Sequence, residues 1–164
     1  LVRRVMDLML AFPSLLLAAA LSAVVAPSML GVVLVLTVSS WAAPARVLSG
    51  LADAIVARDH VTAAVALGAS RVRIAWRHVL PLLSQAVWVQ LTQAFGGAIV
   101  AEASLAFLGL SAPPLSPPMY ASWGGMLDDG VALLFAAPHL WWPPALAVLV
   151  VAAAAQVAVM DSDG

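Results

Sequence analysis

Arginine and histidine, the residues most able to do chemistry in this sequence, gather between positions 58 and 78, in a segment flanked by long apolar stretches. The ionisable residues there are Arg58, Asp59, His60, Arg71, Arg73, Arg77 and His78. His60 and His78 lack the spacing of a metal-binding motif, and His139 lies far along the chain. No Ser-His-Asp motif for nucleophilic catalysis is recognisable either. We therefore expect a protein that is not an enzyme and that holds neither a metal nor a cofactor.

Two residue types are missing from the chain, and each absence excludes a kind of chemistry. Without cysteine there are no disulfides, no thiolate catalysis and no cysteine-based metal sites. Without lysine the phosphate-binding loop G-x-x-x-x-G-K-[ST] cannot form, so this chain cannot be a P-loop ATPase by itself. Any ATP hydrolysis linked to it must come from a partner chain.

The flanking elements are apolar enough to belong in a membrane. Of the 164 residues, 64% are hydrophobic and 9% are charged, a composition that a soluble domain of this size could not bury. Apolar runs of about 18 residues or more predict membrane-spanning helices. We expect one all-α, polytopic transmembrane domain over residues 1–164, with about four spans near 8–26, 27–45, 82–108 and 138–160.

The positions of the arginines predict the topology. Arg3 and Arg4 precede the first span, and every other arginine lies between the second and third spans. By the positive-inside rule, segment 46–81 faces the cytoplasm and the loop 111–130, which has no basic residue, lies outside. Arginines at such a place could also serve only to hold the topology and to contact anionic lipid.

A motif inside the arginine-bearing segment gives it a more specific meaning. In "TAAVALGASRVRIAWRHVLP", Ala63 and Ala64 are followed four residues later by Gly68, and then by Leu80 and Pro81. This spacing resembles the cytoplasmic signature of ABC importer permeases, which runs Glu-Ala-Ala, three residues, glycine, nine residues, Ile-x-Leu-Pro. Two positions depart from it.

The departures are Thr62 for the glutamate and His78 for the isoleucine. "ALGAS" and "RHVLP" resemble the dipeptide, oligopeptide and nickel branch of that family, as do "RVMDLMLAFPSLLLA" (4–18) and "EASLAFLGLSAPPLSPPMYASWGGMLDDG" (102–130). The resemblance covers nearly the whole chain.

The resemblance implies a subunit of the bacterial inner membrane with several partners and no nucleic acid. These are P-loop ATPase subunits, a second permease subunit, an extracytoplasmic substrate-binding protein and the lipid bilayer. The implied coupling residues are Thr62, Ala63, Ala64, Gly68, His78, Leu80 and Pro81. Composition alone predicts a short alanine-rich helix over 61–67, ended by glycine in a left-handed conformation, and a proline that opens the next span. Thr62 lacks the carboxylate with which the family's residue could pair.

Polar residues of the third predicted span are candidates for a substrate path or gate. Gln85, Thr92, Gln93 and Gly96 share a sector of about 100° on a helical wheel. They could line an aqueous route, or they could pack and hydrogen-bond between helices. Glu102 falls near the outer boundary, where it could shape a gate or sit among lipid headgroups.

Two other interpretations stay open at this point. The chain begins at a membrane boundary without methionine, so we expect residue 1 to be an interior point of a longer protein. It could instead be a truncated, non-transporting fragment of a permease, or a membrane scaffold without ATP coupling. The substrate is not readable from the sequence, since peptides, metal complexes and other small solutes all fit.

Overall fold

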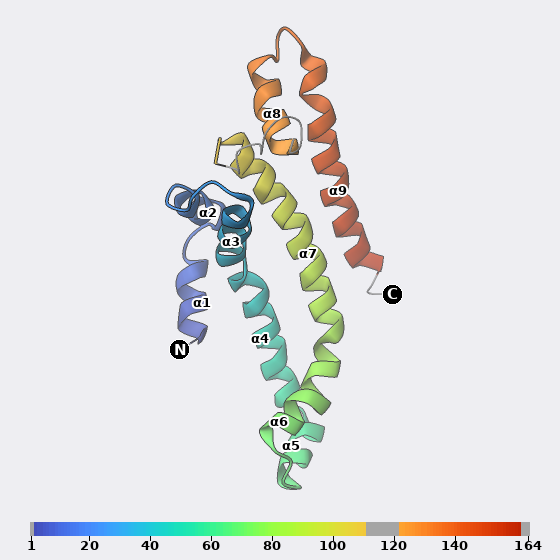
Figure 1. Ribbon diagram of the computed structural model, residues 1–164. Coiled ribbons are helices and arrows are strands. Elements are labelled where there is room, and N and C mark those ends of the chain that lie inside the picture. The colour runs from blue at the N-terminus through green and yellow to red at the C-terminus, as the bar shows by residue number, and fades with distance from the viewer. Residues whose placement is uncertain (1, 111–121, 162–164) are drawn as a thin grey trace.

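A computed structural model describes residues 2–110 and 122–161 of the chain, and these residues form helices and turns without a strand (Figure 1). The α-helices are α1 (Val2–Leu10), α2 (Ser14–Ser22), α3 (Met29–Ser40), α4 (Ala42–Val56), α5 (Asp59–Ala66), α6 (Arg71–Ile74), α7 (Leu80–Phe107), α8 (Trp123–Ala132) and α9 (Trp142–Asp161). A π-helix, η1 (Ala75–Val79), precedes α7, and a 3₁₀-helix, η2 (Pro138–Leu140), precedes α9. The prediction of an all-α fold is confirmed.

The helices form an elongated molecule organised around α7. α4 packs beside α7, and both lead to α5 and α6 at one end (Figure 1). α8 and the start of α9 form the opposite end, and both contact α7. A small core joins α2, α3 and α7 through Ala18, Val35 and Leu105.

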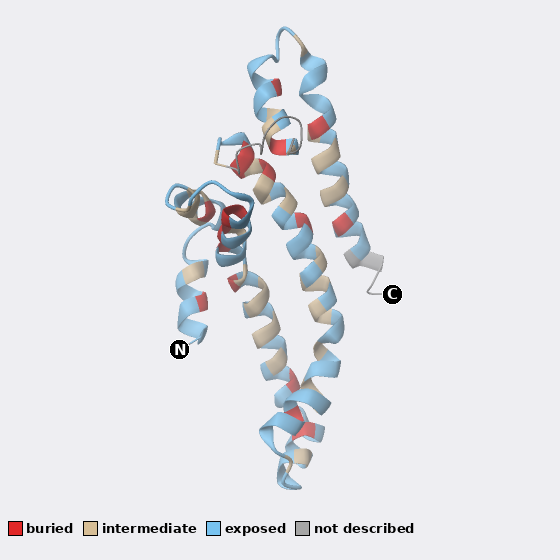
Figure 2. Cartoon of the chain, viewed as in Figure 1, coloured by how far each residue is buried: buried red, intermediate tan, exposed pale blue. Residues whose placement is uncertain are grey.

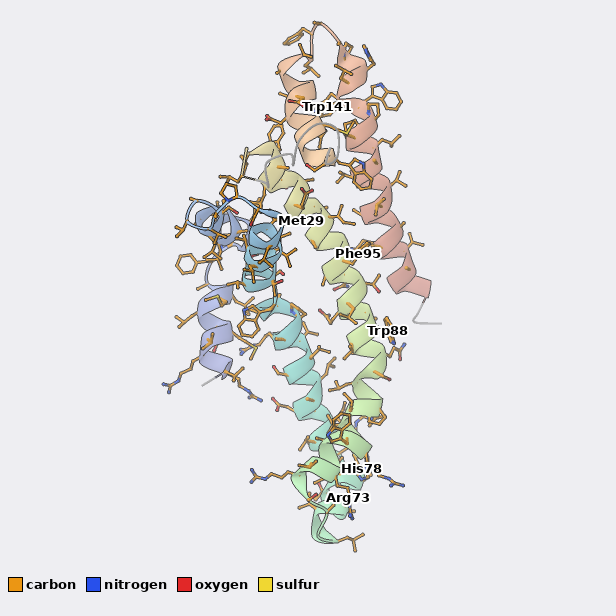
Figure 3. All side chains as sticks on the ribbon, in the orientation of Figure 1. Met29, Arg73, His78, Trp88, Phe95 and Trp141 are labelled. Carbon is orange, nitrogen blue, oxygen red and sulfur yellow. The ribbon has the colours of Figure 1, made fainter. Side chains whose placement is uncertain are left out.

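The chain leaves most of its apolar surface uncovered (Figure 2). Its accessible surface is 11140 Å² for a mass of 16.9 kDa. A compact soluble monomer of that mass would expose about 7,700 Å². Large side chains such as Trp88 and Phe95 of α7 stand outward (Figure 3). Lipid or partner chains are the surroundings that such a surface requires.

The spans are less uniform than the apolar runs predict. Within the described residues, one helical stretch, Pro138–Ala158, is by itself long and apolar enough to cross a membrane. Up to three such crossings result if α1 with α2, bent by 90°, and α3 with α4, bent by 40°, each form one broken span. α7 has 28 residues and is about 42 Å long, but its three glutamines and Glu102 make it less apolar.

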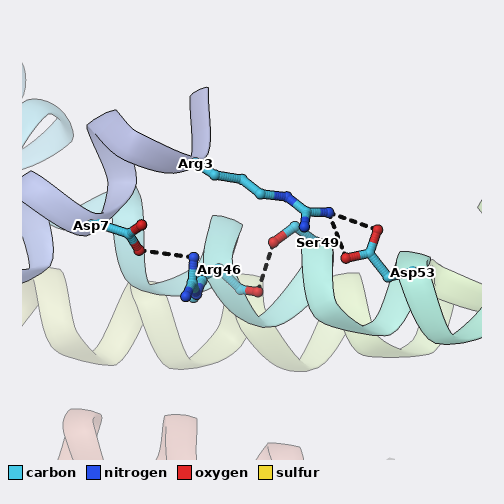
Figure 4. Close-up of polar contacts among 5 residues, drawn as sticks. All are labelled: Arg3, Asp7, Arg46, Ser49 and Asp53. Carbon is cyan, nitrogen blue, oxygen red and sulfur yellow. Dashed lines mark hydrogen bonds and ion pairs between the residues drawn. The ribbon is translucent and has the colours of Figure 1, made fainter. Parts of the chain in front are cut away.

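Two local causes explain where the helices depart from the predicted spans 8–26 and 27–45. Pro13 has no N–H and restricts the residue before it, so α1 ends at Leu10 and α2 starts after the proline. α4 continues past the predicted boundary at residue 45. Its Arg46 pairs with Asp7 of α1 at 2.8 Å, and its Asp53 accepts a hydrogen bond from Arg3 at 2.7 Å (Figure 4). These pairs hold α1 antiparallel against α4.

Candidate functional site

The alanine-rich helix at the arginine-bearing end is α5. A glycine, Gly68, follows it and ends the helix. Gly68 has φ 81°, a left-handed conformation that other residues rarely adopt. The Gly68 N–H donates to the Val65 carbonyl at 2.9 Å, and the Ala69 N–H donates to the Ala64 carbonyl at 3.0 Å. These two bonds make a Schellman motif, which satisfies the last carbonyls of the helix. The predicted helix and its left-handed glycine are confirmed.

The first positions of the signature, including the departure Thr62, lie on α5 or directly after it. Thr62, Ala63 and Gly68 are exposed, and Ala64 is half-buried. The Thr62 hydroxyl donates to the Arg58 carbonyl at 3.3 Å, so it serves its own helix. A Cβ added at Gly68 would meet no atom within 4 Å. The space in front of Gly68 is therefore open to another molecule.

The segment after α4 has one buried side and one apolar side without cover. Ile55 of α4, Val61 of α5 and Ile74 of α6 are buried, and Val61 is only 1% exposed. On the outside, four large apolar side chains are half exposed or more: Val65, Leu67, Val72 and Trp76. Leu67 is 88% exposed. A rigidly anchored tip with an apolar outer surface is suited to docking against a protein.

The charges around this tip have no acidic partners within the described part of the chain. The ion pairs found there join α1 to α4, and none involves Arg58, Arg71, Arg73 or Arg77. All four are exposed, and Figure 3 shows Arg73 at this end of the molecule. Four unpaired positive charges favour an acidic partner surface or anionic headgroups.

Pro81 shapes the junction between the tip and α7. α7 begins at Leu80, and Pro81 is within its first turn, where the missing N–H costs nothing. Its ring would clash with the carbonyl of Arg77 in a regular helix. The preceding turn is instead a π-helix, in which the Leu80 N–H donates to the Ala75 carbonyl. This widened turn carries His78.

A pair of histidines joins α5 to the base of α7, and the spacing of these residues in the sequence did not indicate it. The rings of His60 and His78 have centroids 6.1 Å apart and are tilted by 41°. They come together because the chain reverses direction at Gly68. A helical hairpin predicted between residues 60 and 78 would have indicated this contact. No third histidine, cysteine or acid joins the pair among the residues described.

The polar residues of α7 do not form one continuous lining. Gln85 lies in an open groove of about 450 Å³ between α4 and α7, together with Gln90 and Arg58. The Thr92 hydroxyl donates to the Trp88 carbonyl at 3.0 Å, within its own helix. Gln93 is exposed and lies outside this groove. Their neighbour Gly96 is buried against α9, where an added Cβ would lie 3.2 Å from Cβ of Ala155.

Glu102 is connected to the helix at the opposite end. Its half-buried side chain hydrogen-bonds to the side chain of Ser122. The Ser122 Oγ also accepts from the Gly125 N–H at 3.1 Å and so caps the N-terminus of α8. Gly124 brings the two helices into close contact, because a Cβ there would lie 2.5 Å from the Ala103 carbonyl oxygen. Glu102 therefore sits where α7 meets α8.

Comparison with known proteins places the whole chain in one group. A family described as "Binding-protein-dependent transport system inner membrane component" matches residues 1–162. A Brucella suis biovar 1 (strain 1330) protein, provisionally named a peptide transport system permease protein, is 41% identical over 130 residues, which are 79% of this chain and 43% of the relative.

A second relative comes from Escherichia coli O6:K15:H31 (strain 536 / UPEC). This glutathione transport system permease protein is 36% identical over 148 residues, which are 90% of this chain and 48% of its own length. The chain thus spans about half the length of the curated relatives it matches.

Proposed function

The chain belongs to the family of binding-protein-dependent transport system inner membrane components, and on that premise we propose that it forms the transmembrane subunit of an ATP-driven ABC importer and couples to an ATPase through residues 59–81. The family and these relatives are transport permeases, not enzymes. In this proposal ATP hydrolysis belongs to a partner chain with a P-loop.

The tip formed by α5 and α6 carries the proposal. It combines the matched signature with a helix that is anchored on one side by Val61, and it presents apolar side chains and unpaired arginines on the other. A rigid element that packs against the start of a long helix can pass a displacement to it. α5 contacts α6, and α6, η1 and α7 follow one another without a break, so a push on the tip would move the base of α7.

Thr62, Ala63, Ala64 and Gly68 form the proposed contact surface for the ATPase. Small side chains at these positions let another protein approach the backbone of α5 closely. His78, Leu80 and Pro81 belong to the junction that transmits the movement to α7.

The remaining parts of the proposal concern the path, the substrate and the partners. Gln85, Thr92 and Gln93 are candidates for the path and Glu102 for an outer gate, within a domain of about four spans. The names of the relatives support a peptide or a similar small solute as the substrate. The expected partners are two ATPase subunits, a second permease subunit and an extracytoplasmic substrate-binding protein.

Gly68→Val tests the coupling. A β-branched residue in a left-handed conformation costs about 1–2 kcal/mol and adds a side chain where the ATPase would approach. We expect normal insertion into the membrane, but loss of ATPase co-purification or ATP hydrolysis without transport. The measurements are the amount of permease in membranes, ATPase recovery after affinity purification, and solute uptake.

Gly109→Val is the matched control. Gly109 has φ 71°, ends α7 in the same hydrogen-bonding motif, and also has open space around its missing Cβ. It carries the same backbone strain near the opposite end of α7, so ATPase recovery should stay normal. If Gly68→Val also retains full ATPase recovery and uptake, the coupling proposal fails and a topological role for the arginines remains.

A further inference from the structure

The turn between α8 and α9 is the most exposed apolar feature at its end of the molecule. Phe135 has a relative exposure of 101%, and its neighbours Leu133 and Leu134 are 46% and 38% exposed. Residues 131–138 include no polar side chain. The turn lies at the extreme end of the molecule, beyond both helices (Figure 1).

The position of the turn along the chain indicates what surrounds it. It leads directly into Pro138–Ala158, the stretch that by itself is able to cross a membrane. That stretch is about 31 Å long, close to the thickness of the hydrocarbon core, so its first residue falls near the membrane boundary. Trp141 and Trp142 follow, 39% and 55% exposed, and tryptophan is typical of that boundary.

The backbone of the turn is partly paired within the protein. The N–H groups of Leu133 and Leu134 donate to carbonyls in the last turn of α8. Those of Ala136 and Ala137 donate to the Leu133 carbonyl at 3.0 and 2.7 Å. The Phe135 N–H makes no such bond among the described residues, so the turn suits the interfacial layer, where water remains, and not the hydrocarbon core.

A glycine fixes the direction of the turn. A Cβ at Gly130 would lie 2.9 Å from the Cα of Trp141, so the end of α8 and the start of α9 are in close backbone contact. Asp128 and Asp129, just before this contact, are exposed. Carboxylates remain in water, and the turn lies farther out along the hairpin than both of them, so it can reach the interfacial layer but not the hydrocarbon core.

We propose that residues 133–137 form a lipid-contact site that lies in the interfacial layer of the bilayer, with Phe135 as its anchor. The occupant is the headgroup and upper acyl region of the surrounding lipid, because this site continues the surface that Trp141 and Trp142 present on α9. The inference depends on the membrane location of the family and is independent of coupling to an ATPase.

Depth measurements on single cysteines test the site. The chain has no native cysteine, so Phe135→Cys can be labelled with the fluorophore NBD in permease reconstituted in phosphatidylcholine–phosphatidylglycerol nanodiscs. Asp129→Cys serves as the water control. Leu149→Cys, on a residue of α9 that is 64% exposed, serves as the deep-lipid control.

We expect the label at 135 to emit to the blue of the label at 129 and to be several-fold less quenched by iodide. Nitroxide lipids labelled at the headgroup should quench it more than lipids labelled in mid-chain, whereas position 149 should show the reverse order. Emission and iodide quenching equal to those at 129 would overturn the proposal. Protection from iodide without quenching by either lipid would also overturn it, because protein would then cover the turn.

Discussion

Glu102 has two interpretations that experiment can separate: a residue of an outer gate, or a residue that only faces lipid headgroups. The hydrogen bond between its side chain and that of Ser122 links α7 to the N-cap of α8. If Glu102 is a gate residue, as we propose, this connection would carry a movement of α7 to α8. A residue that only faces headgroups would not depend on it.

Two substitutions distinguish the carboxyl group from the hydrogen bond. Glu102→Gln keeps an acceptor for Ser122, whereas Glu102→Ala removes it. A hydrogen bond to a charged group exceeds a neutral one by about 1 kcal/mol, which is about a five-fold change in an equilibrium. We expect uptake to fall several-fold in Glu102→Gln and further in Glu102→Ala, with normal insertion and ATPase recovery. Unchanged uptake in both variants would leave Glu102 as a headgroup-facing residue.

Single residues of the arginine-bearing segment were predictable where their conformation depends only on near neighbours in the chain. Glycine after an alanine-rich run predicts a left-handed helix end, and Gly68 has that conformation. The contact of His60 with His78 was not predictable, because it depends on how the chain reverses between them. The hydrogen bond between Glu102 and Ser122 likewise joins residues far apart in the sequence, and their separation along the chain does not predict it.

At the scale of elements, α7 and α9 are held together by small residues. Gly96 faces α9, and the Cβ of Ala155 and the carbonyl of Ala152 are the atoms nearest to its missing side chain. Close approach of backbones is a common way to join helices in a membrane. From the sequence, Gly96 could either pack against another helix or line an aqueous route. The contact with α9 favours packing.

Gly96→Val should therefore weaken the α7–α9 pair. Overpacking of this kind costs about 1–3 kcal/mol. We expect a lower unfolding free energy in micelles, measured by circular dichroism during denaturation with sodium dodecyl sulfate. Ala155→Gly in the same protein should restore part of the loss. Gly97→Val is the control, since nothing lies within 4 Å of the Cβ position of Gly97. Equal losses at 96 and 97 would argue against this packing.

Helix boundaries were harder to predict than helix content. Long apolar runs indicate which residues avoid water, but a helix ends where its backbone is interrupted. Pro13 divides the run 8–26, whereas Arg46 does not end α4, because arginine is a good helix former and its charge ends only the apolar run. Both could have been read from the sequence, whereas the pairing of Arg46 with Asp7 depends on the position of α1.

For the whole molecule, the topology depends on whether α7 crosses the membrane. Its length is sufficient, but its glutamines and Glu102 reduce its hydropathy. In a complex with further spans, those polar groups would face other helices or water instead of lipid. The ends of the molecule support a crossing, because the arginine-bearing tip and α8 lie at opposite ends of α7 (Figure 1).

Single-cysteine labelling decides this question. Ser70 and Asp129 are both exposed, and α7 separates them along the chain. If α7 crosses, a membrane-impermeant maleimide should react with Ser70→Cys from the cytoplasmic side and with Asp129→Cys from the outer side, in inside-out and right-side-out vesicles respectively. Leu149→Cys, inside the apolar stretch, should react slowly in both. Reaction of positions 70 and 129 from the same side would require an even number of crossings between them. α7 would then be a surface or re-entrant helix, and the positive charges would no longer predict the placement of the outer loop.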